Sequence, residues 1–291
     1  MAASPVTRFA PSPTGLLHCG HAFSALSAWR LAAEIQGQFL LRIEDIDSTR
    51  CRPEYEAQLK DDLHWLGMTW PEPVRRQSEH LAEYQGVANE LERRGLLYPC
   101  FCSRKDIQRE IEAAGGAPHG TEGPLYPGTC RRLAADEVAI RIASGEPYAL
   151  RLNLEQALKT VPANLQWLDL HKGVQTARPQ LLGDVVLVRR DIGCSYHLCV
   201  VVDDALQQVT HVSRGMDLFE ATHLHRLLQA ILGLPVPVYA HHPLIRDPQG
   251  KRLAKRDGAE SLQMLRLQGV SPDDLKQRLF APATQTQDGH S

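Results

Sequence analysis

The sequence predicts an α/β fold built on a parallel sheet, and three observations support this prediction. A short apolar run before Pro11 leads into a loop with two prolines and a glycine, and an amphipathic helical segment follows over residues 21–35. A second apolar run at residues 39–43 then reads as a buried strand, which completes a strand–helix–strand unit. Such a unit places its two strands in parallel. Further apolar runs from residue 184 onward supply more strands for the same sheet.

Composition limits the class of protein. A chain of 291 residues with 43% hydrophobic residues can bury the core of one large domain or two smaller ones. Its 32 Lys and Arg residues nearly balance 34 Asp and Glu residues, which argues against a generic polyanion-binding protein but permits a local basic patch. No apolar run approaches the roughly 20 residues that span a bilayer, and residues 1–5 lack the apolar segment of a signal peptide. We expect a cytoplasmic protein whose seven cysteines are thiols or metal ligands rather than disulfides.

The helices of the first third are bounded by recognisable residues. The helix over residues 21–35 carries an apolar stripe, and Gly37 is its predicted C-cap. A second helix is predicted over residues 53–66. Ser78 is predicted to cap a third helix, which ends in two arginines before Gly95.

Residues 100–175 are predicted to be an insertion into the parallel sheet, because a long polar stretch rich in Gly and Pro interrupts the apolar pattern there. The next strands are predicted at residues 184–188, 196–204 and 209–212, and a helix at residues 218–232.

The last helix is predicted to begin at Ser271 as N-cap, and the tail after Phe280 has the composition of a disordered end. The expected organisation has four parts. They are the first half of a catalytic domain at 1–99, an inserted metal-bearing subdomain at 100–175, the second half at 176–245, and a loop with a short helical C-terminus at 246–291.

His18 and His21 open the first helix directly after a strand and a Pro/Gly loop. Two partly exposed surface histidines are the commoner outcome for such a pair. Helix N-termini, however, present unpaired backbone N–H groups and a favourable dipole to anions, and histidines there can donate hydrogen bonds to phosphate oxygens. This position favours a phosphate site.

The segment from Gly250 to Arg256 places four cations within six residues. A solvated basic loop is the plainer interpretation. Paired with the histidine element, it is also typical of a mobile loop whose lysine closes on a leaving pyrophosphate.

Cys100 and Cys102, together with Cys130, offer three thiolates, one short of the usual four zinc ligands. Three unrelated buried thiols are the alternative. On ligand chemistry alone His119 is the favoured fourth ligand, and Tyr126, four residues before Cys130, is the less obvious one. The remaining cysteines are expected to be structural: Cys19, Cys51, Cys194 and Cys199.

Glu44, Tyr196 and Arg214 each follow or lie within a predicted strand. Taken singly they are an exposed acid, a core tyrosine and a surface arginine. Together with Arg8 they could bracket a small zwitterion, with an acid for its ammonium group and guanidinium groups for its carboxylates.

Residues 8–15 with 18–21 resemble the HIGH element of class I aminoacyl-tRNA synthetases, in the form typical of glutamyl-tRNA synthetases. Other segments match that family in the same order, at residues 41–47, 196–204 and 211–215 and in the loop 251–256. The resemblance covers roughly residues 5–260 and implies a Rossmann-like parallel sheet.

After Arg256 only 35 residues remain, too few for the helical anticodon-binding domains of full-length glutamyl-tRNA synthetases, so we expect no such domain. The cysteine pattern is similar to the zinc site of a shortened paralogous family, the glutamyl-queuosine tRNA(Asp) synthetases. That resemblance implies one structural zinc ion per chain, held by Cys100, Cys102, Tyr126 and Cys130. Two departures are Ala254, where class I enzymes usually have Ser, and the 23 residues between Cys102 and Tyr126.

The paralogous family activates L-glutamate with ATP and Mg²⁺ without tRNA, and then esterifies it to queuosine at the wobble position of tRNA(Asp). By resemblance, glutamate is held by Arg8, Ala10, Ser12, Glu44, Tyr196 and Arg214. ATP is bound by His18, Gly20, His21 and Lys255, of which His18, His21 and Lys255 are catalytic. We expect a monomer with no membrane partner.

Three other functions are compatible with parts of the pattern. A truncated glutamyl-tRNA synthetase would charge the 3′ end of tRNA. Small cytidylyl- or adenylyl-transferases share a His-x-Gly-His element but lack the lead-in at residues 8–12. A catalytically degenerate paralogue would bind RNA only, although the intact histidines and Lys255 argue against it.

Overall fold

The computed structural model describes residues 4–107, 119–120, 123–245 and 260–281. The loop with Lys255 and the tail after residue 281 lie outside the described residues. Among the described helices none is long and apolar enough to cross a membrane.

The predicted strand–helix–strand unit is confirmed. Strand β1 (Val6–Phe9) pairs in parallel with β2 (Gln38–Ile43), with Thr7 opposite Phe39, and helix α1 (Cys19–Glu34) connects them. Beyond β2 lies the short strand β3 (Arg75–Arg76), also parallel.

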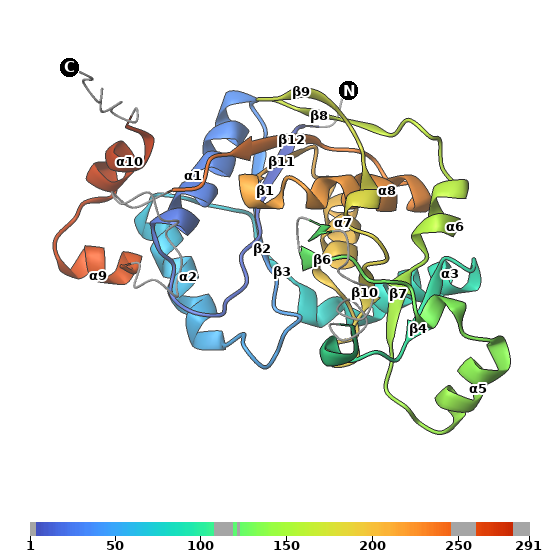
Figure 1. The fold of residues 1–291 in the computed structure, drawn as a ribbon. Coiled ribbons are helices and arrows are strands. Elements are labelled where there is room, and N and C mark those ends of the chain that lie inside the picture. The colour runs from blue at the N-terminus through green and yellow to red at the C-terminus, as the bar shows by residue number, and fades with distance from the viewer. Residues whose placement is uncertain (1–3, 108–118, 121–122, 246–259, 282–291) are drawn as a thin grey trace, which may run out of the picture.

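A second group of strands continues this layer (Figure 1). Strand β11 (His211–Gly215) pairs in parallel with β12 (Val238–His242), which borders β8 (Gln166–Asp169) and then β9 (Gly173–Thr176). Hydrogen bonds at the start of β1 join the two groups, because the Thr210 N–H donates to the Val6 carbonyl at 3.0 Å. The carboxyl ends of β1, β2, β11 and β12 therefore meet at one edge.

Alternating side chains of β1 face two different layers. Thr7 donates a hydrogen bond to the Ala28 carbonyl of α1 at 3.0 Å, and Phe9 packs in the core that α1 shares with α2 (Pro53–Trp65). Arg8 points the other way, toward α7 (Tyr196–Leu206). Because successive strand residues face opposite sides, α1 covers one face of the sheet and α7 the other.

The second core lies on the α7 side. It is formed by α3 (Leu81–Arg93), α7 and α8 (Ala221–Leu232). The 3-10 turn η1 (Gln77–His80) precedes α3, and the 3-10 turn η4 (Met216–Leu218) precedes α8.

A separate antiparallel sheet, β10–β7–β4, lies beside this core, with strands β4 (Leu97–Cys100), β7 (Ala149–Leu152) and β10 (Val186–Val188). The apolar run at residues 184–188 does form a strand, but it joins this sheet and not the parallel one, so that expectation was wrong. Apolar periodicity identifies a strand but not its partner.

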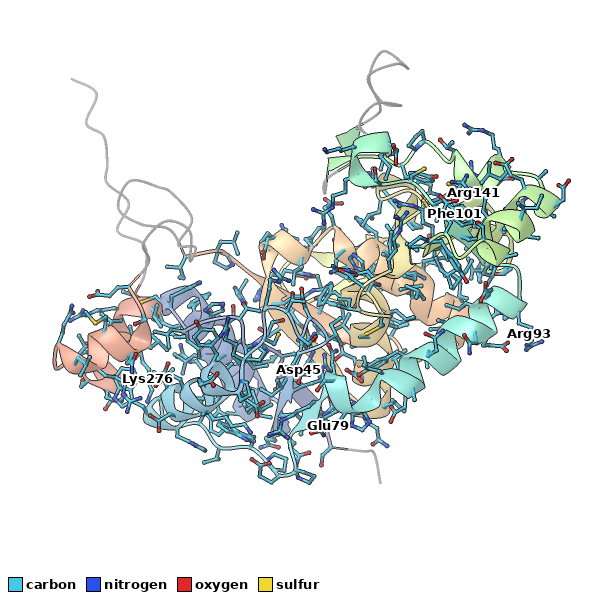
Figure 2. All side chains as sticks on the ribbon, turned by 90° about the horizontal axis from the view of Figure 1, so that it is seen from below. Asp45, Glu79, Arg93, Phe101, Arg141 and Lys276 are labelled. Carbon is cyan, nitrogen blue, oxygen red and sulfur yellow. A yellow bond between two sulfur atoms is a disulfide. The ribbon has the colours of Figure 1, made fainter. Side chains whose placement is uncertain are left out.

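The remaining elements flank these layers. They are the two-stranded pair β5 (His119–Gly120) and β6 (Gly123–Pro124), the turns η2 (Cys130–Arg132) and η3 (Pro179–Leu181), and the helices α5 (Ala135–Ala143), α6 (Leu154–Lys159), α9 (Leu262–Leu267) and α10 (Pro272–Phe280). Figure 2 shows Phe101 and Arg141 together at one end of the molecule and Lys276 of α10 at the other.

The apolar run at residues 196–204 is a helix, α7, and not the predicted strand. The Ser195 side chain caps it by accepting from the Leu198 N–H, and residues 198–204 are all buried. A helix buried on all sides carries no polar stripe, so its sequence loses the 3.6-residue pattern and reads as a strand.

Two predicted caps are also corrected. Helix α1 ends at Glu34, and Gln36 rather than Gly37 adopts the left-handed backbone, with φ of 51°. Gly37 is needed for a different reason, because a Cβ there would meet the Pro5 carbonyl oxygen at 2.5 Å. Ser78 lies in η1, where its N–H and hydroxyl both donate to the Asp45 carboxylate, and His80 precedes α3.

Other boundaries agree with the sequence. Helix α2 begins at Pro53, and Ser271 caps α10 by accepting from the Asp274 N–H at 3.1 Å. The expectation that all cysteines are thiols was wrong for one pair, because Cys194 and Cys199 are joined as a disulfide. The domain boundaries at residues 99, 175 and 245 stay a prediction.

Candidate functional site

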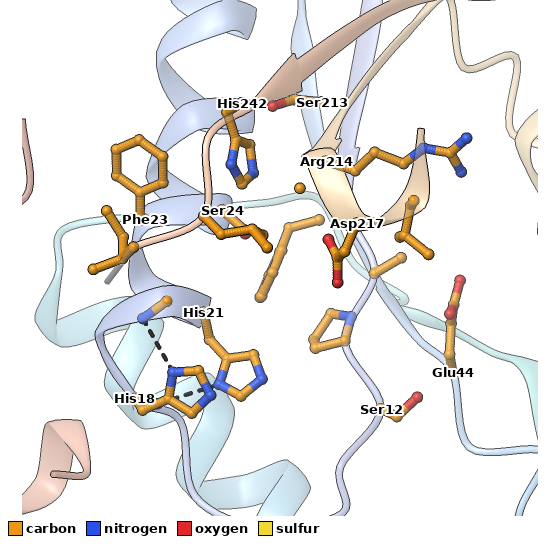
Figure 3. A pocket seen from close by; sticks show the side chains of 18 of the residues that line it. Ser12, His18, His21, Phe23, Ser24, Glu44, Ser213, Arg214, Asp217 and His242 are labelled. Atoms are coloured by element: carbon orange, nitrogen blue, oxygen red, sulfur yellow. Dashed lines mark hydrogen bonds between the residues drawn. The ribbon is translucent and has the colours of Figure 1, made fainter. Parts of the chain in front are cut away.

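A cavity of about 560 Å³ opens at the carboxyl edge of the parallel strands (Figure 3). Its walls come from the loop after β1, the start of α1, the ends of β2, β11 and β12, and the first residue of α7. Ligands of open parallel sheets bind at this edge because the connecting loops converge there. The predicted site residues that line it are Arg8, Ala10, Ser12, His18, Gly20, His21, Glu44, Tyr196 and Arg214.

His18 and His21 form the cap of α1. The His18 N–H donates to Nδ1 of His21 at 3.2 Å, and the Gly20 N–H donates to Nδ1 of His18 at 3.0 Å. This is the reciprocal arrangement of a capping box, with imidazoles in place of the usual hydroxyl and carboxyl groups. Because each Nδ1 accepts, each neutral ring carries its proton on Nε2 and can donate from there. The two ring centroids are 3.8 Å apart.

The opposite side of the cavity is charged, and Figure 3 shows Glu44 and Arg214 there, away from the two histidines. Arg8 donates to both oxygens of Asp204, at 3.0 and 3.3 Å. Arg42 donates to Asp204 at 2.7 Å and to Glu44 at 3.2 Å. Arg8, Arg42, Glu44, Asp204 and Arg214 are all buried. Among the described residues, each of these charged groups except Arg214 forms an ion pair, as buried charges generally require.

Burial and these pairs act in opposite directions on the carboxyl groups. Burial raises the pKa of Glu44, and the charges of Arg42 and Arg8 oppose that rise. Burial also acts to raise the pKa of Asp204, but Arg8 and Arg42 hold it below its usual value. Asp204 is therefore a firm anionic anchor for the two arginines.

Tyr196 occupies the first position of α7 and reaches the cavity from the helix N-terminus, so its predicted place in a strand is corrected while its predicted place at the site holds. Burial raises the pKa of its hydroxyl, which stays protonated. The structure brings these side chains together; their individual roles stay predictions.

Sequence reasoning missed four residues of this region. Asp204 holds Arg8 in place, and Arg42 holds Glu44. Both are charged residues beside or within apolar runs, which was the available signal, because a buried charge needs a partner. Asp217 and His242 line the cavity itself. The Nδ1 of His242 lies 3.0 Å from the Pro243 carbonyl, and its buried Nε2 has no hydrogen-bond partner among the described residues.

The thiols of Cys100, Cys102 and Cys130 form a second cluster, and none of the three lines the cavity. Their sulfur atoms all lie within 4.8 Å of one another, and Cys102 Sγ is 3.4 Å from Cys130 Sγ. The Tyr126 hydroxyl lies 3.6 Å from Cys102 Sγ and accepts from the Cys130 N–H at 2.9 Å. The side chain of His119 lies outside the described part of the structure.

This donor set fits a zinc ion. Zinc–thiolate bonds of about 2.3 Å in a tetrahedron place sulfur atoms about 3.8 Å apart, close to the spacing here. Burial raises the pKa of the Cys102 thiol to about 12. Burial acts in the same direction on Cys130, but hydrogen bonds from Tyr126 and from the Phe101 N–H hold the pKa of Cys130 below its usual value.

Comparison with known proteins decides the family. The model of the catalytic domain of class I tRNA synthetases (E and Q) matches residues 5–282. The chain belongs to this family. It is therefore an aminoacyl-tRNA synthetase-like ligase, and class I synthetases use ATP and Mg²⁺.

The curated relatives differ in how much of their own length the chain covers. The chain is 52% identical to a glutamyl-Q tRNA(Asp) synthetase of Rhodobacter capsulatus, over 93% of this chain and 98% of the relative. It is 45% identical to a protein of the same name from Symbiobacterium thermophilum, over 91% and 82%. A glutamate–tRNA ligase of Aquifex aeolicus is 41% identical, but this chain covers only 55% of it.

Among solved structures, the synthetase is similar to a glutamate tRNA ligase from Elizabethkingia meningosepticum in complex with its amino acid. The TM-score is 0.74 with 31% identity, over 88% of this chain and 53% of that one. This similarity agrees with the class I fold expected from the sequence.

Proposed function

We propose that this synthetase activates L-glutamate with ATP in the absence of tRNA and transfers the glutamyl group to queuosine at the wobble position of tRNA(Asp). The similarity to proteins named glutamyl-Q tRNA(Asp) synthetase, over more than 90% of this chain and more than 80% of each relative, carries this proposal. The cavity supports it, because it combines a helix N-terminus suited to phosphate with acidic and basic groups suited to an amino acid.

Glutamate matches the charged side of the cavity. Its two carboxylates suit the guanidinium groups of Arg8 and Arg214, which form charge-assisted hydrogen bonds with carboxylates, and its ammonium group suits Glu44. Ala10, Ser12 and Tyr196 complete the wall around it. Residues of both signs on one wall select a zwitterion over a simple anion.

ATP would occupy the side formed by the cap of α1. The N–H groups at the start of α1 and the Nε2–H groups of His18 and His21 favour phosphate oxygens there. Gly20 leaves room for this approach, and Lys255 would reach the phosphates from the loop outside the described residues. Mg²⁺, which class I synthetases use, would offset part of the phosphate charge.

The activation step needs no general base from the protein. The α-carboxylate of glutamate, with a pKa near 4, is already ionised at neutral pH and attacks the α-phosphorus of ATP, expelling pyrophosphate. The protein therefore contributes position and stabilisation of the developing negative charge. A hydroxyl of the acceptor then attacks the acyl carbon of the glutamyl adenylate. An ester forms, the acyl–phosphate bond breaks, and AMP leaves with release of the hydroxyl proton.

The thiol cluster would hold one structural zinc ion through Cys100, Cys102, Tyr126 and Cys130. Such an ion would join β4 to the turn η2, because Cys100 ends β4 and Cys130 begins η2. We also propose that the protein is a cytoplasmic monomer. Light scattering would test its oligomeric state.

Two measurements test the proposal. Pyrophosphate exchange without tRNA, run across the amino acids, should depend on glutamate; no exchange, or preference for another amino acid, would overturn it. Transfer of labelled glutamate to tRNA(Asp), with and without queuosine, should then label the wobble nucleoside. A label on the terminal adenosine would instead identify a shortened glutamyl-tRNA synthetase, and RNA binding without exchange would identify a degenerate paralogue.

A further inference from the structure

Arg214 is a buried cation without a carboxylate partner among the described residues. It lies in β11, is 5% exposed and lines the cavity. Arg8, at the same cavity, bonds instead to both oxygens of Asp204. The two buried arginines of this pocket therefore differ in whether a carboxylate neutralises them, and the reason lies in the residues around Arg214.

The partners of Arg214 are two imidazoles and a hydroxyl. Its Nε–H donates to Nε2 of His241 at 3.1 Å, one terminal nitrogen donates to Nδ1 of His225 at 3.1 Å, and the other donates to the Thr222 hydroxyl at 2.5 Å. We call these three residues the Arg214 cage. His225 and Thr222 come from α8 and His241 from β12, so three separate elements meet around one side chain.

The hydrogen bonds determine the protonation of both histidines. A guanidinium group only donates, so the imidazole nitrogens that face it must accept and carry no proton. His241 then donates from Nδ1 to the Asp169 carboxylate at 2.6 Å. His225 donates from Nε2 to Nδ1 of His197 at 3.1 Å. Each ring is thereby held as one neutral tautomer.

The charge and burial of the cage agree with this assignment. Burial, and then the charge of Arg214, lower the pKa of His241 to about 4. The same two causes, in the same order, bring the pKa of His225 well below its usual value. Both rings are neutral at physiological pH and contribute no compensating charge. Asp169 reaches Arg214 only through His241.

From this arrangement we infer that the cage positions Arg214 through neutral acceptors and so leaves its positive charge to be neutralised by the substrate carboxylate. Of the five N–H bonds of the guanidinium group the cage engages three, and the remaining two, on the terminal nitrogens, are left for a ligand. A carboxylate in the cage would cancel the charge that recruits glutamate. His225, His241 and Thr222 are therefore positioning residues that set the affinity for an anionic side chain or α-carboxylate. This inference rests on the proposed function, since it takes glutamate as the ligand.

A pair of isosteric substitutions separates charge from shape. His225→Asn and His225→Asp both place an oxygen near the former Nδ1, but only the aspartate adds a negative charge beside Arg214. We expect His225→Asp to raise the KM for glutamate at least about tenfold with the KM for ATP nearly unchanged, because the added carboxylate offsets the charge of Arg214 and repels the carboxylate of glutamate. His225→Asn should keep the KM for glutamate within about threefold of wild type.

Calorimetric titration of glutamate into the wild-type chain keeps the two proposals apart. Wild type that binds no glutamate overturns the proposed function and the cage inference with it. Wild type that binds glutamate, with equal KM values in the two variants, overturns the cage inference alone. Where His225→Asp does not fold, Thr222→Asp and Thr222→Asn make the same comparison from the other side of the guanidinium group, and the same equality would overturn it.

Discussion

The Asp204 carboxylate lies 3.0 Å from Nε of Arg8, although the two residues are 196 positions apart in the sequence. Arg8 comes from the first strand of the chain and Asp204 from helix α7, which covers one face of the sheet. Asp204 also receives a 2.7 Å hydrogen bond from Arg42 of the neighbouring strand. One carboxylate therefore orients two buried arginines beside the cavity.

Replacing Asp204 with Asn should destabilise the protein and weaken glutamate binding together. The change leaves two buried guanidinium groups without their shared anion, which costs about 3 kcal/mol in the free energy of unfolding. Urea denaturation and the KM for glutamate in pyrophosphate exchange measure the two effects. The control is Asp47→Asn, which breaks an ion pair whose Arg50 side chain is 69% exposed. That pair should contribute less than about 1 kcal/mol. Equal losses in both variants would contradict the role of Asp204.

Replacing Lys255 with Ala should lower the rate of tRNA-independent pyrophosphate exchange by about 100-fold or more, because the developing charge on the leaving pyrophosphate loses its cation. The residue lies outside the described part of the structure, so this prediction rests on the family pattern. Circular dichroism should show an unchanged fold. Lys251→Ala, in the same loop, serves as the control and should retain most of the exchange rate. Normal exchange by the Lys255 variant would remove it from the catalytic set.

Elemental analysis should find about one zinc ion per chain, since thiolates are preferred zinc ligands and three thiols lie together here. Cys130→Ser should lower the zinc content and the thermal midpoint of unfolding. Cys51→Ser is the matched control, because Cys51 lies outside the thiol cluster. A fully active protein without metal would reject the zinc site.

The fourth ligand can be identified by substitution. The Tyr126 hydroxyl lies 3.6 Å from Cys102 Sγ, and the Arg151 guanidinium stacks 4.0 Å above the centre of its ring, so the ring is held at the cluster. Tyr126→Phe keeps the ring and removes only the oxygen. We expect this variant to lose zinc to a chelator more readily than His119→Ala does. The reverse order would assign the ligand to His119.

Stability should fall as the pH is lowered from about 6.5 to about 4. His241 is 3% exposed, and burial is the main cause that lowers its pKa to about 4. As the pH falls through this window, His241 is therefore protonated in the unfolded chain while it is still neutral in the folded chain. The stabilisation is fully present above the usual histidine pKa and is lost toward pH 4, on the order of 3 kcal/mol for this residue. Chemical denaturation at several pH values measures it. His241→Gln cannot titrate and should show a shallower dependence; an identical slope would contradict the assignment.

Much of the site was predictable because its residues follow elements with strong local signals. The loop between Phe9 and His18 contains prolines and a glycine that break regular structure, and the pair His18 and His21 marks the start of a helix. Glu44 follows a short, apolar strand. Since parallel strands end at one edge, these local features already place their side chains at a common cavity.

Helix α7 shows why other parts were not predictable. Its buried residues Leu198–Val202 form a continuous apolar run, and helix and strand give similar patterns when every face is covered. Val186–Val188 presents the related problem of pairing, because an apolar strand carries no record of which sheet it joins. Both outcomes depend on neighbours supplied by distant parts of the chain.

By itself the sequence predicted a strand–loop–helix element suited to phosphate, acid and arginine residues suited to a small zwitterion, and three thiols with the composition of a zinc site. These are properties of short segments, in which turn residues, caps and ligand types act locally. Only the tertiary structure decided that Asp204 anchors Arg8 while neutral histidines surround Arg214. Compensation of a buried charge depends on which side chains lie within a few ångströms in space, and in this fold those side chains come from strands and helices far apart in the chain.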